Sequence, residues 1–461
     1  CSKNDKACVT ERIIKVRNHV TPPAGSPVRK WAEEFIALVT PSKPLTPESQ
    51  EQVIEAQTRP TQKARNARYL KDGINLEEDS KVKAQQKKEV YADVKPPRNI
   101  STVPTADTVN LGRFAYAMKK HLTQHRWFMP GRNPKGTTAD ISAYCRHRDQ
   151  EPGTDYSKFD GTISSFLREI EQQVMLQSFA GEDKQELAQW LARDTQVKGR
   201  TGYGHAYQTK SSRLSGSQMT TIGNSIINAF VAFAAYRQAD FAPKNAFGMI
   251  GPKYGDDGID DIRGDFASVA PMLGLKIKAD TRDTTNFVTF CGRIYVSPKT
   301  HQSSVFGPLK AIRSLPIAMK GTNHADKVNG YLAVDPQSPL VADYARAIKR
   351  VHGYGDEVVD DFNTRQGPYP YDHHLEGKTI EVISEVLKTS SDAIRQCIAD
   401  LRAAASTKDL EDIRGRYFPN DEREVVENAR FVPQDSPEVV RTTTLDVVDL
   451  ENWTSCVSSN I

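Results

Sequence analysis

No apolar run in the 461-residue sequence approaches the roughly 18 to 20 residues that a membrane-spanning helix requires. The most apolar stretch, residues 226–236, is too short and contains Asn228. The chain also lacks low-complexity blocks and internal repeats, and 38% of its residues are hydrophobic. We therefore expect a folded globular protein rather than a membrane-spanning or disordered one.

Cysteine and net charge are both scarce. The six cysteines show no Cys-x-x-Cys spacing, which favours reduced thiols in a cytosolic compartment over a disulfide framework. Lys and Arg number 62 against 58 Asp and Glu, so any binding to nucleic acid must come from local basic clusters. The sequence begins with Cys1 and without a signal peptide, which suggests that it was cut from a longer polypeptide.

Strand and helix signals alternate clearly between residues 155 and 296. The first 150 residues are rich in charge and proline, which predicts many loops, and the last third shows the spacing of amphipathic helices. Between them we expect a strand end at residues 155–159 that leads into a helix, a helix over 220–237, a hairpin turning at 255–258, and a strand or hairpin over 287–296.

Three short segments, in this order, carry the residues that point to chemistry. Each is common on its own, because paired aspartates beside glycine usually mark a turn. Together they place carboxylates at two separate strand ends, with a glycine-containing loop and helix start between them. The residues are Asp155 and Asp160 in DYSKFDG, Ser215, Gly216, Thr220 and Asn224 in SGSQMTTIGN, and Asp256 and Asp257 in YGDDG.

Carboxylates that converge from two strand ends are suited to hold a pair of divalent cations, Mg²⁺ or Mn²⁺. Such a pair is the usual catalyst of phosphoryl and nucleotidyl transfer, because it activates the attacking hydroxyl and stabilises the leaving group. The pattern therefore predicts a metal-dependent transferase.

The three segments resemble the palm of the RNA-dependent RNA polymerases of positive-strand RNA viruses, and KFDGTI and YGDDGI are similar to nodaviral replicases. The resemblance implies a mixed α+β right-hand fold in which the palm is an antiparallel sheet with helices. Its fingers would span residues 1–150 with an insert at 180–212. The palm would span 151–300, the helical thumb 301–435 and a mobile tail 436–461.

The resemblance also assigns roles within these segments. Asp155 and Asp256 would be the principal metal ligands, with Asp257 beside them. Asp160 and Asn224, with Ser215 nearby, would bind the ribose 2′-hydroxyl, which needs both a donor and an acceptor. Within the same nucleotide-binding segment, Gly216 would let the backbone flex against the template base, and Thr220 matches the family pattern.

Segments outside the palm extend the resemblance, each with a structural alternative. KKEVYADVKPPRNIS resembles the basic motif of the NTP tunnel, with Lys88, Lys95 and Arg98 as triphosphate contacts. The alternative is a solvated basic helix and a proline turn. TPPAGSPVR, with Gly25 and Ser26, is similar to the loop through which the template enters, although such turns are common.

Two further segments follow the hairpin. LGLKIKADTR stands where the family supplies a general acid to pyrophosphate. Lys276, Lys278 and Arg282 could all serve, and we favour Lys278 because a lysine loses a proton more easily than an arginine. FCGRIY resembles the primer-grip hairpin, with Arg293 near the growing strand. For both segments an ordinary structural role is the alternative.

A second Tyr-Gly-Asp, at Tyr354 to Asp356, lacks a preceding serine-glycine loop and is interpreted as a turn or helix cap. The resemblance thus predicts an RNA-directed RNA polymerase that binds RNA template, RNA product and NTPs. By family resemblance we expect self-association and a place in the host cytoplasm on membrane-bound replication complexes. These would lie at the outer mitochondrial membrane, with attachment through a missing N-terminal region. The alternatives are a reverse-transcriptase-like polymerase and a non-catalytic RNA-binding scaffold.

Overall fold

The structure is a computed structural model that describes residues 2–57, 60–72, 82–87, 96–148, 150–283, 285–317, 323–358 and 362–418. For residues 150–153, 155, 278–283 and 362–363 it describes the backbone alone. Lys88, Lys95 and the expected tail lie outside the described residues.

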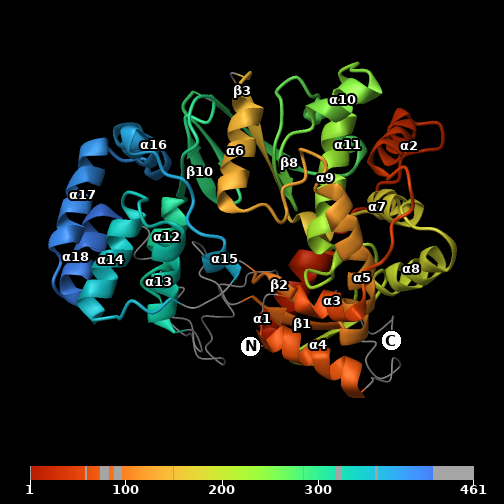
Figure 1. Ribbon diagram of the computed structural model, residues 1–461, viewed down its shortest axis with the longest axis horizontal. Helices are drawn as coiled ribbons and strands as arrows, with labels where there is room; N and C mark the ends of the chain where they lie inside the picture. The colour runs from red at the N-terminus through yellow and green to blue at the C-terminus, as the bar shows by residue number, and fades with distance from the viewer. Residues whose placement is uncertain are drawn as a thin grey trace.

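One sheet has four strands in the order β6-β7-β3-β8, of which β3 and β8 are labelled in the upper half of Figure 1. All three of its pairings are antiparallel, as the sequence analysis predicts for the palm. The strands are β3 (Gln150–Tyr156), β6 (Lys253–Tyr254), β7 (Asp257–Ile259) and β8 (Ile277–Asp283).

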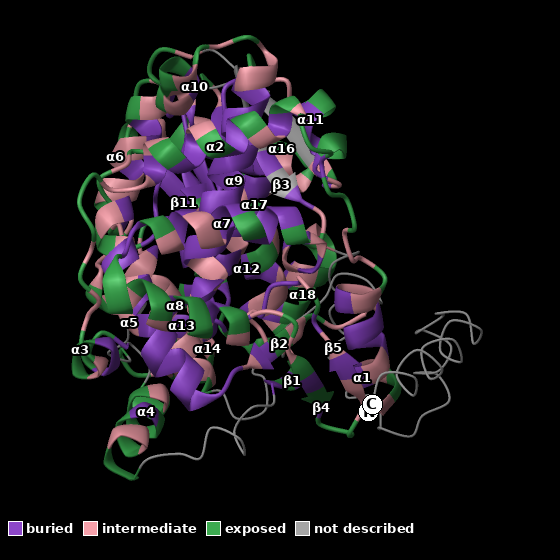
Figure 2. Cartoon of the chain, turned by 90° about the vertical axis from the view of Figure 1, so that its right-hand side faces the viewer, coloured by how far each residue is buried: buried purple, intermediate pink, exposed green. Residues whose placement is uncertain are grey.

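Helix α9 (Met219–Gln238) is the buried central helix against which the neighbouring helices and the hairpin pack. It has no charged residue before Arg237, and all of its residues from Ile222 to Tyr236 are buried, as expected of a helix in a core. Figure 2 shows it buried along its length at the centre of the molecule. The neighbouring helices are α2 (Pro27–Val39), α7 (Ser165–Gln177), α10 (Pro243–Met249) and α11 (Phe266–Met272).

A second sheet, in the order β2-β1-β4-β5, joins the N-terminal region to the segment after α8 (Gly181–Arg193). Its strands are β1 (Val82–Gln86), β2 (Asn99–Thr102), β4 (Lys198–Thr201) and β5 (Ala206–Gln208). The pairing of β1 with β4 brings the insert proposed at 180–212 onto the first 150 residues.

The N-terminal region contains more helix than its proline-rich sequence predicts. Besides α2 it holds α1 (Ser2–Val9), a π-helix (Thr10–Ile14), α3 (Gln50–Glu55), α4 (Pro60–Asp72), α5 (Thr105–Leu122) and α6 (Pro134–Cys145). Several prolines stand at the first helical turn, where the missing N–H costs nothing, as Pro27 and Pro134 do.

A three-stranded sheet, β11-β10-β9, leads from the palm to the helical C-terminal part, which lies at the left of Figure 1. The strands are β9 (Phe287–Phe290), β10 (Arg293–Val296) and β11 (Ser304–Phe306). The helices are α12 (Pro308–Ser314), α13 (His324–Val334), α14 (Val341–His352), α15 (Phe362–Arg365), α16 (Glu376–Leu387), α17 (Ser391–Ala403) and α18 (Thr407–Tyr417). Short 3₁₀ turns occupy Phe159–Thr162 and His373–Leu375.

Most of the predicted elements are present, with shifted ends. The strand expected to end near residue 159 ends at Tyr156, and a 3₁₀ turn separates it from α7. The helix expected at 220–237 is α9, and residues 287–296 form the β9-β10 hairpin. Within the described ranges, no helix combines the length and apolar character needed to cross a bilayer.

Phe35 supplies the prediction for the core. Its ring is fully buried and packs against Phe230 and Phe233 of α9, with centroids 5.6 Å away in both cases. Phe35→Ala should lower the free energy of unfolding by about 3–5 kcal/mol, because it leaves a cavity beneath α9. The control is Ile262→Ala, whose side chain is exposed and whose free energy of unfolding, measured with denaturant, should change by no more than about 0.5 kcal/mol. Equal losses of stability in the two variants would contradict this packing.

Candidate active site

The β6-β7 hairpin carries Asp256 at its tip. Tyr254 pairs with Asp257, so Gly255 and Asp256 form a two-residue turn. Gly255 has φ +63°, whereas Asp256 has a negative φ, which is the pattern of a type II′ turn with glycine first. Asp256 is exposed and Asp257 is half-buried.

Strand register brings the first aspartate to this hairpin. Thr154 of β3 lies opposite Gly258 of β7, and continuing the antiparallel register by one residue sets Asp155 opposite Asp257. On its other side Asp155 pairs with Lys278 of β8. The backbone therefore brings Asp155, Asp257 and Lys278 to one row of the sheet.

Two side chains of α9 hold the hairpin turn. The Asn228 amide donates to the carbonyl oxygens of Gly255, Asp256 and Asp257, each at 3.1 Å, and its oxygen accepts from the Tyr156 hydroxyl at 3.1 Å. The Gly255 N–H donates to Ser225 Oγ at 2.8 Å. Sequence reasoning missed Asn228 and Ser225, although polar residues inside an apolar helix are a signal, because burial requires them to find partners.

Asp160 and Asn224 form a second cluster. Asn224 Nδ2 donates to Asp160 Oδ1 at 2.7 Å, so the structure brings together the two residues that the resemblance assigns to the 2′-hydroxyl. Behind them, Arg213 donates to Asn224 and pairs with the fully buried Glu171.

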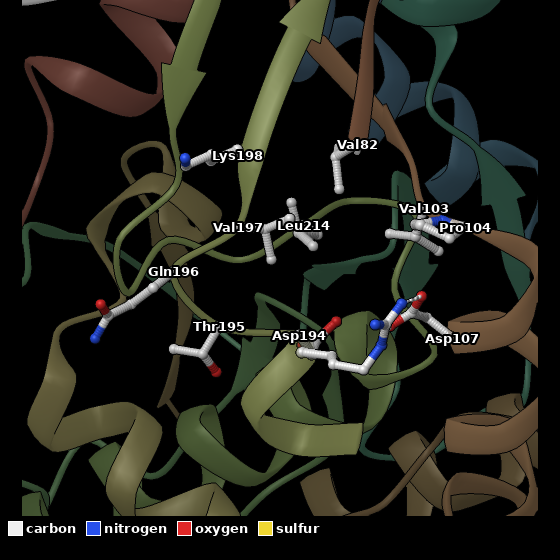
Figure 3. Close-up of a pocket in the computed structure, with 11 residues that line it drawn as sticks. Val82, Val103, Pro104, Asp107, Asp194, Thr195, Gln196, Val197, Lys198 and Leu214 are labelled. Atoms are coloured by element: carbon white, nitrogen blue, oxygen red, sulfur yellow. Dashed lines mark hydrogen bonds and ion pairs between the residues drawn. The ribbon is translucent and has the colours of Figure 1, made fainter. Parts of the chain in front are cut away.

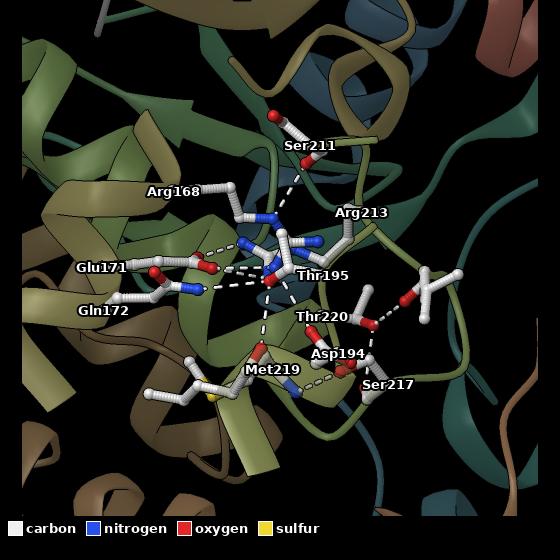
Figure 4. A network of polar contacts seen from close by, with 12 residues as sticks. Arg168, Glu171, Gln172, Asp194, Thr195, Ser211, Arg213, Ser217, Met219 and Thr220 are labelled. Carbon is white, nitrogen blue, oxygen red and sulfur yellow. Dashed lines mark hydrogen bonds and ion pairs between the residues drawn. The ribbon is translucent and has the colours of Figure 1, made fainter. Parts of the chain in front are cut away.

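A network of buried charges continues from Glu171 to Arg168 and Asp194 (Figure 4). Burial raises the pKa of Glu171, but the guanidinium groups of Arg213 and Arg168 outweigh it and hold that pKa below its ordinary value. Glu171 therefore stays ionised beside the two guanidinium groups.

Ser215, Gly216 and Thr220 shape the loop before α9. Ser215 Oγ accepts from the Ser101 N–H at 2.8 Å, and a Cβ at Gly216 would collide with the Ser101 carbonyl oxygen. Thr220 Oγ1 lies 2.7 Å and 2.8 Å from the carbonyl oxygens of Leu214 and Ser217. Close packing against β2 is thus one reason for a glycine at position 216. The backbone flexibility that the resemblance implies is a second.

A hollow of about 410 Å³ lies behind this loop, with Leu214 in its wall (Figure 3). Arg193 in its lining donates two hydrogen bonds of 2.8 Å to Asp107, which also lines it. The other lining residues are Val82, Val103, Pro104, Asp194, Thr195, Gln196, Val197 and Lys198.

Arg293 is the predicted RNA contact whose surroundings differ from expectation. It is buried, donates to both carboxylate oxygens of Asp335 at 2.7 Å and 2.5 Å, and lies over the Tyr369 ring at 3.5 Å. These contacts favour the structural alternative, in which Arg293 ties β10 to the end of α13. A cavity of about 530 Å³ between Tyr254 and these residues opens beside the hairpin.

Two further predicted residues, Arg98 and Gly25, lie at the surface. Arg98 is exposed just before β2, and its carbonyl oxygen accepts from the Lys87 N–H at 2.7 Å. Gly25 has φ +81° in the turn that precedes α2, where Ser26 is the N-cap residue. Among the described side chains no three His, Cys, Asp or Glu form a metal-binding group, and Asp155 is outside that set.

Asn228 provides the prediction for the hairpin. Asn228→Ala should lower the free energy of unfolding by about 1–3 kcal/mol, because three carbonyl groups and one tyrosine hydroxyl lose their partner. Thermal unfolding of Asn228→Ala can be compared with Asn245→Ala, an exposed asparagine of α10. Equal stability of the two variants would show that the amide does not hold the turn.

Comparison with known proteins gives matches in sequence and in fold. Residues 95–310 match the family model of viral RNA-dependent RNA polymerases. The RNA-directed RNA polymerase of greasy grouper nervous necrosis virus is 35% identical over 371 residues, covering 75% of this chain and 36% of that protein. That of Flock house virus is 28% identical over 385 residues, covering 79% and 38%.

The chain thus spans little more than a third of the length of these curated relatives. In fold, the RNA-dependent RNA polymerase of a human picorbirnavirus is similar with a TM-score of 0.51 and 12% identity, over 93% of this chain and 83% of that one. Residues 95–310 of this chain thus resemble the viral RNA-dependent RNA polymerase family, and nodaviral polymerases are among the similar proteins.

Proposed function

We propose that this chain catalyses RNA-templated RNA synthesis from NTPs and so replicates and transcribes a positive-strand viral RNA genome. The observation that carries the proposal is the strand register that sets Asp155 beside Asp257 on the hairpin that exposes Asp256. The match of residues 95–310 to the family model of viral RNA-dependent RNA polymerases supports the same reaction.

The donor set fits two divalent cations, Mg²⁺ or Mn²⁺, because both prefer carboxylate oxygens. Asp155 and Asp256 would be the principal ligands, with Asp257 beside them. When bound, the ions lower the pKa of the RNA 3′-hydroxyl and stabilise charge on the pyrophosphate.

The other residues bind and orient the nucleotide. Asp160 and Asn224 form the sugar-binding pair, since one supplies an acceptor and the other a donor. Lys278, opposite Asp155 in the sheet, is the proposed proton donor to pyrophosphate. Lys88, Lys95 and Arg98 are the proposed triphosphate contacts, and Gly25 and Ser26 the template contacts.

The proposal includes the setting of the reaction. RNA template, RNA product and NTPs are the partners that this activity requires. Self-association and attachment to membrane-bound replication complexes at the outer mitochondrial membrane complete the proposal by family resemblance. Self-association and membrane attachment are separate from the chemistry of the palm. Either could be disproved while the proposed polymerase reaction still holds.

Asp256→Ala tests the reaction. The purified chain should extend a short primed RNA template with NTPs and Mg²⁺ or Mn²⁺, and Asp256→Ala should reduce the rate at least about 10³-fold, because the palm loses a principal metal ligand. Asp356→Ala is the matched control. It alters the second Tyr-Gly-Asp, where Asp356 is exposed and pairs with Lys349 at 2.5 Å, and it should extend RNA at the wild-type rate.

Three results would contradict the proposal. Extension with dNTPs alone would indicate a reverse-transcriptase-like polymerase. RNA binding without synthesis by the folded wild-type chain would favour a non-catalytic scaffold. Equal synthesis by Asp256→Ala and Asp356→Ala would place the catalytic residues elsewhere.

A further inference from the structure

The guanidinium of Arg213 is fully buried behind the pair assigned to the ribose. Its side chain is 0% exposed, as is that of its partner Glu171. Arg213 donates through Nη1 to Glu171 Oε1 at 2.9 Å and through Nη2 to Glu171 Oε2. Its third donor, Nε, bonds Asn224 Oδ1 at 3.0 Å.

This third hydrogen bond decides which way the Asn224 amide faces. A guanidinium has donors and no acceptor, so only the oxygen of Asn224 can face Arg213. The amide nitrogen must then face Asp160, where it donates to Oδ1 at 2.7 Å. A flipped amide would lose both bonds and set its oxygen against a carboxylate.

Arg213 also positions Asp160 through the backbone. The Arg213 N–H donates to the Asp160 carbonyl oxygen at 2.8 Å. Asp160 is only half-buried, and within the described part of the chain its Oδ2 has no hydrogen-bond partner. That oxygen is therefore available to accept from a hydroxyl outside the protein, at a place set by Arg213 from two directions.

Stability alone is a weak reason for this arrangement. A buried Arg–Glu pair gains little over apolar residues of similar volume, because the desolvation of two charges offsets their attraction. The pair does, however, give one residue three fixed donors, which a methionine or leucine in its place could not supply.

We propose that Arg213 is a positioning residue for ribose selection: it holds the Asn224 amide and Asp160 in the one arrangement that recognises a 2′-hydroxyl. The inference rests on the proposed polymerase function. It assigns sugar discrimination to a residue that does not touch the nucleotide, and it predicts that changing this residue impairs the use of NTPs more than that of 2′-dNTPs.

Arg168 offers a matched control. It is almost as buried, with a side chain 4% exposed, and it donates to the same Glu171 Oε1 at 2.9 Å. Its other bonds go to Ser211, Ser212 and Asp194, and none goes to Asn224 or Asp160. Arg168→Met and Arg213→Met therefore remove equivalent buried charges, and only the second frees the amide.

The experiment measures single-nucleotide extension of a primed RNA by the full chain, with ATP and with 2′-dATP, and compares the two kcat/KM values. In Arg213→Met the ratio of ATP to 2′-dATP efficiency should fall about tenfold, the equivalent of one hydrogen bond of ordinary strength. In Arg168→Met the ratio should stay at the wild-type value, even if thermal stability falls.

Arg213→Lys keeps the test open if Arg213→Met fails to fold. The lysine retains a positive charge beside Glu171, but a single ammonium cannot reproduce the guanidinium fork that reaches both Glu171 and Asn224. The ratio of ATP to 2′-dATP efficiency should also fall in Arg213→Lys. A folded Arg213 variant with the wild-type ratio, or an equal fall in Arg168→Met, would overturn the inference while leaving the polymerase intact. A folded wild-type chain that makes no RNA would overturn both.

Discussion

The Asn228 amide, buried in α9, is the contact on which the geometry of the site depends most. It reaches three successive carbonyl groups of the hairpin turn and takes its own hydrogen bond from Tyr156 at the end of β3. One side chain thus joins the two strand ends that carry the aspartates. One helical turn earlier, Asn224 bonds Asp160, so the same face of a rigid helix sets the distance between the hairpin and the proposed ribose pair.

A buried pair of opposite charges, Lys253 and Asp260, lies in the β6-β7 hairpin segment. Lys253 and Asp260 are both fully buried and bond each other across the β6-β7 hairpin. Gly258 makes room for them, since a Cβ there would lie 2.8 Å from Lys253 Nζ and 2.6 Å from Thr154 Oγ1. Such pairs hold register and orientation more than they add stability, because separating them leaves an uncompensated charge in the core. The hairpin that exposes Asp256 therefore has a buried ion pair, Lys253–Asp260, beneath it.

The sequence predicted the local features and missed those set by distant partners. Gly255 before two aspartates predicts a tight hairpin, and the apolar run of α9 predicts a buried helix, because both depend on neighbours in the chain. The buried role of Arg293 could not be predicted from its neighbours in the chain. Its partner Asp335 is 42 residues away, so nothing in FCGRIY separates a buried ion pair from an RNA contact. Arg213 was missed for the same reason, since its partners meet it only after the sheet and α9 have packed. Asn228 differs, because a polar residue inside an apolar helix is a signal in the sequence, but its partners in the hairpin are not.

The central claim is that Asp155 and Asp256 together hold the catalytic metal ions. The most direct measurement is X-ray anomalous scattering from crystals of the chain grown with primed RNA, a non-hydrolysable NTP analogue and Mn²⁺. The account predicts manganese between the carboxylates of Asp155 and Asp256 and in contact with the triphosphate. Manganese bound to the triphosphate but not to these carboxylates would contradict it.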